Sequence, residues 1–365
     1  MQSKILFSSL LLAKLGEGYL LPTPLGKYNV TMRNEAITDY DRDARALMIS
    51  IFQPAECANT VPAIYMPNNT AEYEGKWIEK IFGVPVNLTP LLSEARLPVC
   101  PQNSCLPLPN APILLLSPGY RGSRLYYNFI ASAIASEGYT VITMDHPGET
   151  NAITYLNGST AYSYLPDLVN LDDATPLAYI RAADASFILD QLNNATALPN
   201  FSQKFPTDRV VMAGHSLGGA TAHLAAGQDS RIIGIVNWDG LFLGSLTPEG
   251  APKPVLYMAT ERDDDVRELA KWPEFTGPKL WVKIANLIHE GMLDLPSLLQ
   301  AAGQNSGTFA EYLGSMAPDE IIRIMTAYTV AWMDGVLSGK IGGPLLEGKE
   351  PDRFPDVSVL KKENF

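Results

Sequence analysis

The chain has 365 residues, of which 46% are hydrophobic and 18% are charged. This balance can fill a large packed core and excludes an intrinsically disordered protein. The formal net charge is -12 and no Lys/Arg-rich run occurs, so the chain lacks the basic surface on which nucleic acid binds. We therefore expect no nucleic-acid partner.

The first 18 residues have the composition of a secretory signal peptide. Lys4 precedes an apolar run from Ile5 to Ala13, and Gly16 and Gly18 follow it; the run is too short to span a bilayer. An ordinary apolar N-terminal helix is the alternative. Six Asn-x-Ser/Thr sequons follow, at Asn29, Asn68, Asn87, Asn157, Asn194 and Asn200. Because such sequons are N-glycosylation acceptors in secreted proteins, we expect an extracellular, secreted glycoprotein with no transmembrane segment, its signal over residues 1–18 and one domain over 19–365.

The next part of the chain is one predicted strand and a long irregular stretch. The apolar, β-branched run Arg45 to Pro54 predicts a strand, and the Pro-, Asn- and Thr-rich stretch from Ala55 to Asn110 predicts irregular structure tied by a disulfide. The chain's three cysteines, Cys57, Cys100 and Cys105, lie in this stretch. One bridge is expected, and the spacing leaves all three pairings open.

From residue 111 onward, apolar runs alternate with helical patterns. Uniformly apolar runs bounded by Gly, Pro or Asp are typical of strands buried on both faces of a parallel sheet. They are found at Ala111–Tyr120, Thr140–Gly148, Arg209–Gly214, Ile232–Asp239, Pro254–Thr260 and Lys279–Ile284. Helices are predicted over 126–138, over 176–192, from Leu217 and over 319–337, the last followed by a Gly/Pro-rich tail. The fold class is therefore α/β, a mostly parallel central sheet with helices on both faces.

The most informative motif is the hexapeptide Gly214-His215-Ser216-Leu217-Gly218-Gly219, which lies between a predicted strand and a predicted helix. In this context a G-x-S-x-G pattern predicts a strained elbow that exposes a nucleophilic serine. The flanking positions must be small because the strand and the helix approach closely there. Ser216 is the predicted nucleophile of an α/β-hydrolase fold.

A serine nucleophile needs a general base, and the chain has four histidines. His215 adjoins the nucleophile, His223 lies seven residues on in the next helix, and His146 ends an earlier strand, where we interpret the Asp145-His146 pair as structural. The chain order of this fold, Ser then acid then His, leaves His289, in the loop after the last predicted strand.

Two places can supply the acid that orients His289. Asp239 ends the strand 232–239, and the acidic run Glu261 to Asp265 follows the next strand. A single buried carboxylate suits the work of holding an imidazole better than a charge run, which is usually a solvated face. Asp239 is therefore preferred, and the run stays open as the alternative.

An oxyanion intermediate needs two backbone N–H donors, one from the residue after the nucleophile and one from the loop after an earlier strand. These positions are Leu217 and Tyr120, the latter in the turn Ser117-Pro118-Gly119-Tyr120. A plain turn whose tyrosine stacks at the site entrance is compatible with this role. No paired His/Cys ligand spacing and no phosphate-binding loop occur, so we predict neither a metal nor a cofactor.

These segments resemble the platelet-activating factor acetylhydrolase family of secreted α/β hydrolases, especially fungal members. The resemblance is carried by LLPTPLGKYNV, LLLSPGYRGSRLYY, EGYTVITMDHPGET, RAADASFILDQL, GHSLGGAT, NWDG and LIHEGM. It implies that the acid is Asp239 and that the donors are Tyr120 and Leu217. The turn reads PGYR where animal members have a His-Gly turn, so Tyr120 is matched by position. SPGY and GHSLGG also resemble bacterial cutinases and polyesterases, in which the acid follows the next strand.

The sequence thus predicts a serine esterase that cleaves short acyl esters, the sn-2 acetyl group of a 1-alkyl-2-acetyl phospholipid among them, with transient lipid-surface contact. The first alternative is a general carboxylesterase or cutinase-like polyesterase. The second, from another class, is a hydrolase-fold binding protein without catalysis. The segment Thr154 to Ile180 is interpreted either as part of an acyl entrance or as an ordinary connection.

Overall fold

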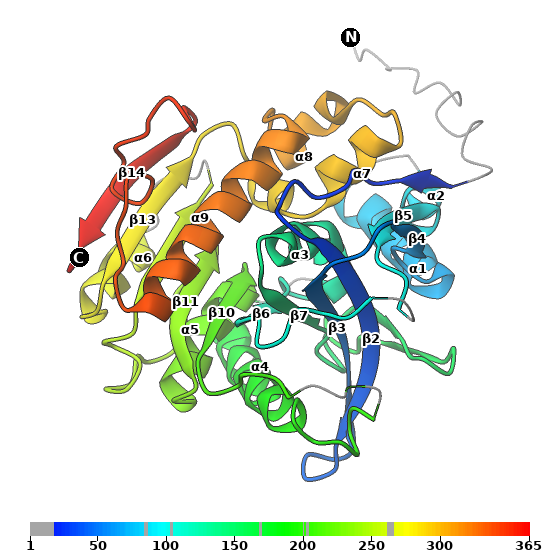
Figure 1. Ribbon diagram of the computed structural model, residues 1–365, viewed down its shortest axis with the longest axis horizontal. Coiled ribbons are helices and arrows are strands. Elements are labelled where there is room, and N and C mark those ends of the chain that lie inside the picture. Colours follow the sequence, from blue (N-terminus) through cyan, green and yellow to red (C-terminus); the bar gives the residue numbers. More distant parts are fainter. Residues whose placement is uncertain are drawn as a thin grey trace.

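The computed structural model describes residues 18–83, 87–102, 105–167, 170–199, 201, 204–260 and 266–365. A sheet of nine strands runs through the centre of the molecule, in the order β14-β13-β12-β11-β10-β6-β7-β3-β2 (Figure 1). The proposed signal peptide lies outside the described residues apart from Gly18, and the acidic run 261–265 also lies outside them.

The six central strands are parallel, and the predicted apolar runs account for all of them. They are β6 (Ile113–Ser117), β7 (Thr140–Met144), β10 (Val210–His215), β11 (Ile232–Trp238), β12 (Val255–Ala259) and β13 (Lys279–Ile284). Antiparallel strands flank them: β2 (Asn29–Asp39) and β3 (Arg45–Ala55) at one edge, β14 (Val357–Glu363) at the other. The predicted α/β-hydrolase fold class, with a mostly parallel sheet, is confirmed.

Helices cover both faces of this sheet. On one face, α4 (Leu171–Gln191) and α5 (Leu217–Gln228) lie side by side; on the other, α9 (Pro318–Ser338) crosses the strands next to α3 (Asn128–Ser136) (Figure 1). Successive residues of β6 divide between the two cores, because side chains of a strand alternate between its faces. Leu114 and Leu116 pack with the α3 and α9 side, whereas Ile113 and Leu115 pack with the α4 and α5 side.

Helix α4 begins earlier than predicted. Its N-cap is Asn170, whose side chain accepts a hydrogen bond from the Asp173 amide at 2.9 Å. Pro176 lies inside the helix rather than at its start. A polar N-cap, not the proline, sets this boundary.

The expectation of irregular structure over residues 55–110 is wrong. The described part of this stretch forms β4 (Val61–Ile64), α1 (Asn68–Phe82), α2 (Thr89–Ser93) and β5 (Ala95–Val99), and a small sheet joins β4 and β5 to β1 (Tyr19–Leu20). Buried Ala71 and Ile78 anchor α1 to the core. Tertiary packing stabilises a helix here in spite of weak local propensity.

Other segments also contain elements that the sequence did not predict, among them the edge strand β2. The C-terminal tail returns to the sheet as β14. The segment 154–180 includes the end of a short hairpin, β8 (Ala152–Thr154) and β9 (Thr160–Tyr162), and the first half of α4. Within the described ranges, every helix is too short or too polar to cross a bilayer.

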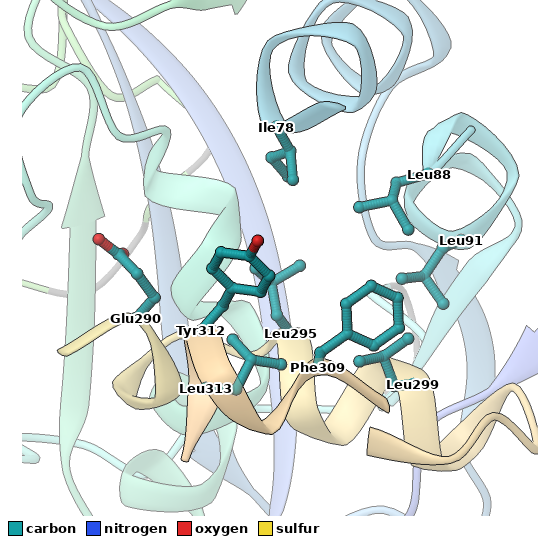
Figure 2. A pocket seen from close by; sticks show the side chains of 9 residues that line it. All are labelled: Ile78, Leu88, Leu91, Glu290, Leu295, Leu299, Phe309, Tyr312 and Leu313. Atoms are coloured by element: carbon teal, nitrogen blue, oxygen red, sulfur yellow. The ribbon is translucent and has the colours of Figure 1, made fainter. Parts of the chain in front are cut away.

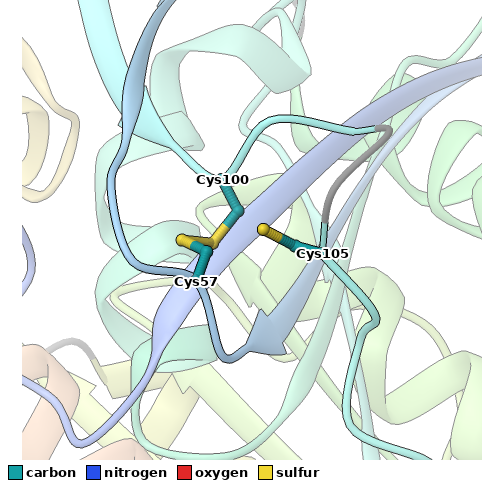
Figure 3. A group of neighbouring side chains, drawn as sticks. All are labelled: Cys57, Cys100 and Cys105. Atoms are coloured by element: carbon teal, nitrogen blue, oxygen red, sulfur yellow. A yellow bond between two sulfur atoms is a disulfide. The ribbon is translucent and has the colours of Figure 1, made fainter.

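The three cysteines lie together beside β3 (Figure 3). Cys57 and Cys100 form a disulfide that closes 43 positions of chain, and Cys105 is buried and lies outside this bridge. All three sulfur atoms lie within 4.8 Å of one another. The structure thus selects one of the three pairings that the spacing left open.

Candidate functional site

The predicted nucleophile lies at the turn from β10 into α5, and its backbone is strained. Ser216 has φ 56° and ψ −121°, a region that residues other than glycine seldom adopt. The turn is also crowded: a Cβ on Gly214 would lie 2.0 Å from the carbonyl carbon of Gly218, and one on Gly218 would lie 2.0 Å from the Ser117 oxygen. The requirement for small residues on both sides of Ser216 is confirmed.

The predicted acid and base are in contact. His289 begins the short 3-10 helix η4 (His289–Met292), and its Nδ1 lies 2.6 Å from Oδ2 of Asp239. Asp239 is fully buried, while the His289 side chain is 26% exposed. A buried carboxylate at Nδ1 fixes the tautomer in which Nε2 can accept a proton. Of the two positions considered for the acid, Asp239 contacts His289. The other, the run 261–265, lies outside the described residues.

Asp239 is held by the strand beside its own. It follows β11 at φ 55°, in a tight turn that the Asn237 side chain closes by accepting the Gly240 N–H at 2.7 Å. Thr260, at the end of β12, donates its N–H to Oδ1 at 2.9 Å and its hydroxyl to Oδ2 at 2.7 Å. Sequence reasoning missed Thr260, because a threonine after a strand carries no signal of what it faces.

The predicted base, His289, and the predicted nucleophile, Ser216, are linked through His215. The ring of His215, the residue before Ser216, lies 4.4 Å from the ring of His289. Its Nε2 is 3.0 Å from the His289 carbonyl oxygen, and its Nδ1 is 2.9 Å from the Tyr127 hydroxyl. The Tyr127 hydroxyl in turn accepts the Gly119 N–H at 3.1 Å. His215, which sequence reasoning set aside, thus links the histidine loop to the turn 117–120.

The two predicted oxyanion donors flank Ser216. A Cβ on Gly119 would lie 3.4 Å from the Cβ of Ser216, so the turn that carries Tyr120 passes directly beside the nucleophile. Leu217 opens α5, where the first amides of a helix have no acceptor within it. The Tyr120 ring is half-buried, and its hydroxyl donates to the Pro166 oxygen at 2.7 Å. The structure therefore brings Tyr120, Leu217, Ser216, Asp239 and His289 to one edge of the sheet.

A second Ser-His-Asp constellation lies beneath this site. Nε2 of His146 is 2.9 Å from Oγ of Ser117, and Nδ1 is 2.8 Å from Asp184. All three side chains are fully buried, and burial is the main cause that lowers the pKa of His146. No substrate can reach a hydroxyl in this position, so the structural interpretation of His146 agrees with its surroundings.

Comparisons with known proteins find two family models that match overlapping parts of the chain. A family model described as alpha/beta hydrolase fold matches residues 112–278, which include Tyr120, Ser216 and Asp239. A second, described as platelet-activating factor acetylhydrolase, isoform II, matches residues 15–173. Together the two models cover the chain from residue 15 to residue 278, ahead of His289.

Similar proteins cover more of the chain. A probable 1-alkyl-2-acetylglycerophosphocholine esterase from Arthroderma benhamiae is 28% identical over 97% of both chains. Platelet-activating factor acetylhydrolase from Canis lupus familiaris is 21% identical over 93% of this chain and 83% of its own. A ferulic acid esterase from Streptomyces cinnamoneus shares the fold, with TM-score 0.76, 24% identity, and coverage of 94% and 100% of the two chains.

Proposed function

We propose that this chain, a serine-type hydrolase with the α/β-hydrolase fold that is similar to the platelet-activating factor acetylhydrolases, removes short acyl groups from lipid esters. The proposed substrate is a glycerophospholipid with an sn-2 acetyl or similarly short acyl group. The observation that carries this proposal is the contact of His289 with buried Asp239 beside the strained Ser216.

The proposed reaction proceeds through an acyl-enzyme. His289 Nε2 takes the hydroxyl proton as Ser216 Oγ attacks the ester carbonyl carbon, and the Tyr120 and Leu217 amides bind the resulting oxyanion. The C–O bond to the lipid then breaks, and His289 returns the proton to the leaving alcohol. Water, activated by the same histidine, releases the short acid and restores the serine. No step needs a metal or a cofactor.

A small apolar pocket lies beside the loop that carries His289. Glu290, the residue after the histidine, lies at one end of it, and its carboxylate points away from the leucines (Figure 2). The remaining lining comes from α1, α2 and its preceding loop, α7 (Leu295–Ala301), η5 (Ser306–Phe309) and α8 (Ala310–Leu313): Ile78, Leu88, Leu91, Leu295, Leu299, Phe309, Tyr312 and Leu313. The cavity volume is about 30 Å³, far below the roughly 300–1,000 Å³ of a ligand pocket, so the choice of a lipid ester rests on the similar proteins and not on this pocket.

The proposal includes secretion. The disulfide Cys57–Cys100 is typical of an oxidising compartment. Four of the predicted glycosylation asparagines are exposed on the surface: Asn68, Asn87, Asn157 and Asn194. Asn29 is half-buried and Asn200 lies outside the described residues. A shift in mass after enzymatic deglycosylation of the protein from its native culture medium is the expected result; a chain found only in cell lysate without glycan would contradict this part.

Substrate and mechanism are tested together with a panel of 4-nitrophenyl esters of increasing acyl length and a 1-alkyl-2-acetyl phospholipid. We expect activity to fall steeply beyond short acyl groups, to survive a chelator, and to vanish in Ser216→Ala. A flat chain-length profile would instead favour a general carboxylesterase or cutinase-like enzyme. Failure of a fluorophosphonate to label Ser216 would favour the non-catalytic alternative.

The acid is tested separately. Asp239→Asn is expected to lower kcat about 10⁴-fold, as loss of the correct histidine tautomer does in other serine hydrolases. The matched variant Asp264→Asn changes the acidic run that was the alternative, and we expect it to retain activity. The reverse result would transfer the role to that run.

A further inference from the structure

The turn after β6 carries the proposed oxyanion donor, and its carbonyl groups are held by one buried arginine. Arg181 lies in α4 and is fully buried. Its Nη1 donates to the Pro118 oxygen at 2.5 Å, and its Nη2 donates to the Gly119 oxygen at 2.9 Å. A planar guanidinium can hold two successive carbonyl oxygens at once, which an ammonium group cannot do in the same way.

The amides of the same turn are satisfied with one exception. Gly119 N–H donates to the Tyr127 hydroxyl at 3.1 Å, Arg121 N–H to Glu149 at 3.4 Å, and Gly122 N–H to the Gly119 oxygen at 3.0 Å. Among the described residues, the Tyr120 N–H has no acceptor. Since backbone donors in folded proteins are almost always paired, this free donor is poised for a ligand oxygen.

The arginine determines where that donor points. The peptide bond between Gly119 and Tyr120 is trans, so its C=O and N–H point in opposite directions. Because Arg181 holds the C=O, the Tyr120 N–H is directed away from α4. The turn passes against Ser216 at Gly119, so rotation of this one peptide would remove the donor from the site.

The charge of Arg181 is balanced by Glu149. The guanidinium Nε donates to one carboxylate oxygen at 2.8 Å and Nη2 contacts the other. Glu149 also accepts the Arg121 N–H, so the same carboxylate binds both the arginine and the turn. Such a pair must be fully bonded to be tolerated when buried.

We propose that Arg181, held by Glu149, is a positioning residue that sets the orientation of the Tyr120 amide in the oxyanion hole. The inference rests on the proposed function, because it takes Tyr120 as the oxyanion donor. Arg181 itself does not touch the substrate. It acts through the two carbonyl groups that it binds.

The test compares Arg181→Lys with Arg124→Lys. Arg124 is equally buried and paired with Asp145, but its side chain contacts Ser50 and Asp145 and, in the described structure, none of the carbonyls of the turn. We expect Arg181→Lys to lower kcat for 4-nitrophenyl acetate on the order of 10- to 100-fold, with KM and the midpoint of the pH–rate profile unchanged. Affinity for a trifluoromethyl ketone, whose adduct with Ser216 places an oxyanion in the hole, should fall by the same factor.

A purely structural role predicts a different pattern. Arg181→Lys and Arg124→Lys would then lose thermal stability alike and keep both kcat and ketone affinity, which would overturn the inference. Should Arg181→Lys be insoluble, the paired variant Arg181→Met, Glu149→Gln leaves no unpaired buried charge, and the same loss of kcat and ketone affinity is expected of it. Wild-type activity in Ser216→Ala would overturn the proposed function instead, so the two failures are distinguishable.

Discussion

Replacing Thr260 with valine tests how Asp239, the proposed catalytic acid, is held in place. The side chain keeps its shape but loses the hydroxyl that donates to Asp239 at 2.7 Å, while the Thr260 N–H remains on the other carboxylate oxygen at 2.9 Å. A hydrogen bond to a charged group contributes about 1.5–3 kcal/mol. Because the N–H donor of Thr260 is retained, we take the lower end, which corresponds to about a tenfold loss of kcat/KM.

The assay is the initial rate on 4-nitrophenyl acetate, measured beside thermal unfolding of each variant. Thr260→Ser retains the donor and is expected to stay within about twofold of the wild type, although it loses a buried methyl group. The reasoning is refuted if Thr260→Val is as active as the wild type, or if serine impairs the rate as much as valine does.

Three further predictions follow from other contacts. Gly218→Ala places a Cβ 2.0 Å from the Ser117 oxygen and should destabilise the fold by about 3 kcal/mol or more, seen as a lower Tm; an unchanged Tm would contradict the crowding at the elbow. Burial raises the pKa of Glu74 to about 8 from its usual 4.5. The protonated side chain therefore contributes its full stability below pH 4.5, and this contribution is lost as pH rises through 8. Between pH 5 and 8, the Tm of Glu74→Gln should fall by less than the Tm of the wild type. A non-reducing digest of Cys105→Ser should still contain the two peptides joined by the Cys57–Cys100 disulfide. Loss of this linked pair would point to a different pairing.

The parallel core of the fold could be predicted from the sequence because its strands are buried on both faces. A run such as Ile113–Ser117 has no polar alternation that would confuse it with a surface strand. The edge strands gave no such signal. In β14 every residue of Val357–Glu363 is exposed or half-buried, and three of them are charged. Its identity as a strand depends on pairing with β13, a contact 70 or more residues away.

The residues of the candidate site also divide into those that the sequence signals and those that only the structure reveals. Ser216, His289 and Asp239 were identified because each belongs to a motif or to a strand end with restricted chemistry. Thr260 belongs to no motif, and Arg181 opens the segment RAADASFILDQL without any signal of what it faces. Their roles come from the partners that they meet in space, the Asp239 carboxylate and two carbonyl groups of a turn. Such residues can be recognised only when the backbone atoms they bind are located.

The long stretch before β6 shows the limit of composition as a guide. Its prolines and asparagines predicted irregular structure, yet α1 forms over Asn68–Phe82 and contributes Ile78 to the apolar pocket. A helix that begins with two asparagines and contains Gly75 has modest intrinsic propensity. What stabilises it is the buried face, on which Ala71 and Ile78 pack against the core.

The buried constellation of Ser117, His146 and Asp184 has a consequence for how serine hydrolases are recognised. Its hydrogen-bond lengths of 2.9 and 2.8 Å would satisfy a geometric search for a catalytic triad as well as any working site does. The difference lies in backbone strain and in burial: Ser216 has φ 56° at an elbow, whereas Ser117 ends a regular strand and is fully buried. Three side chains at hydrogen-bond distance thus become an enzyme only where an ester can reach them.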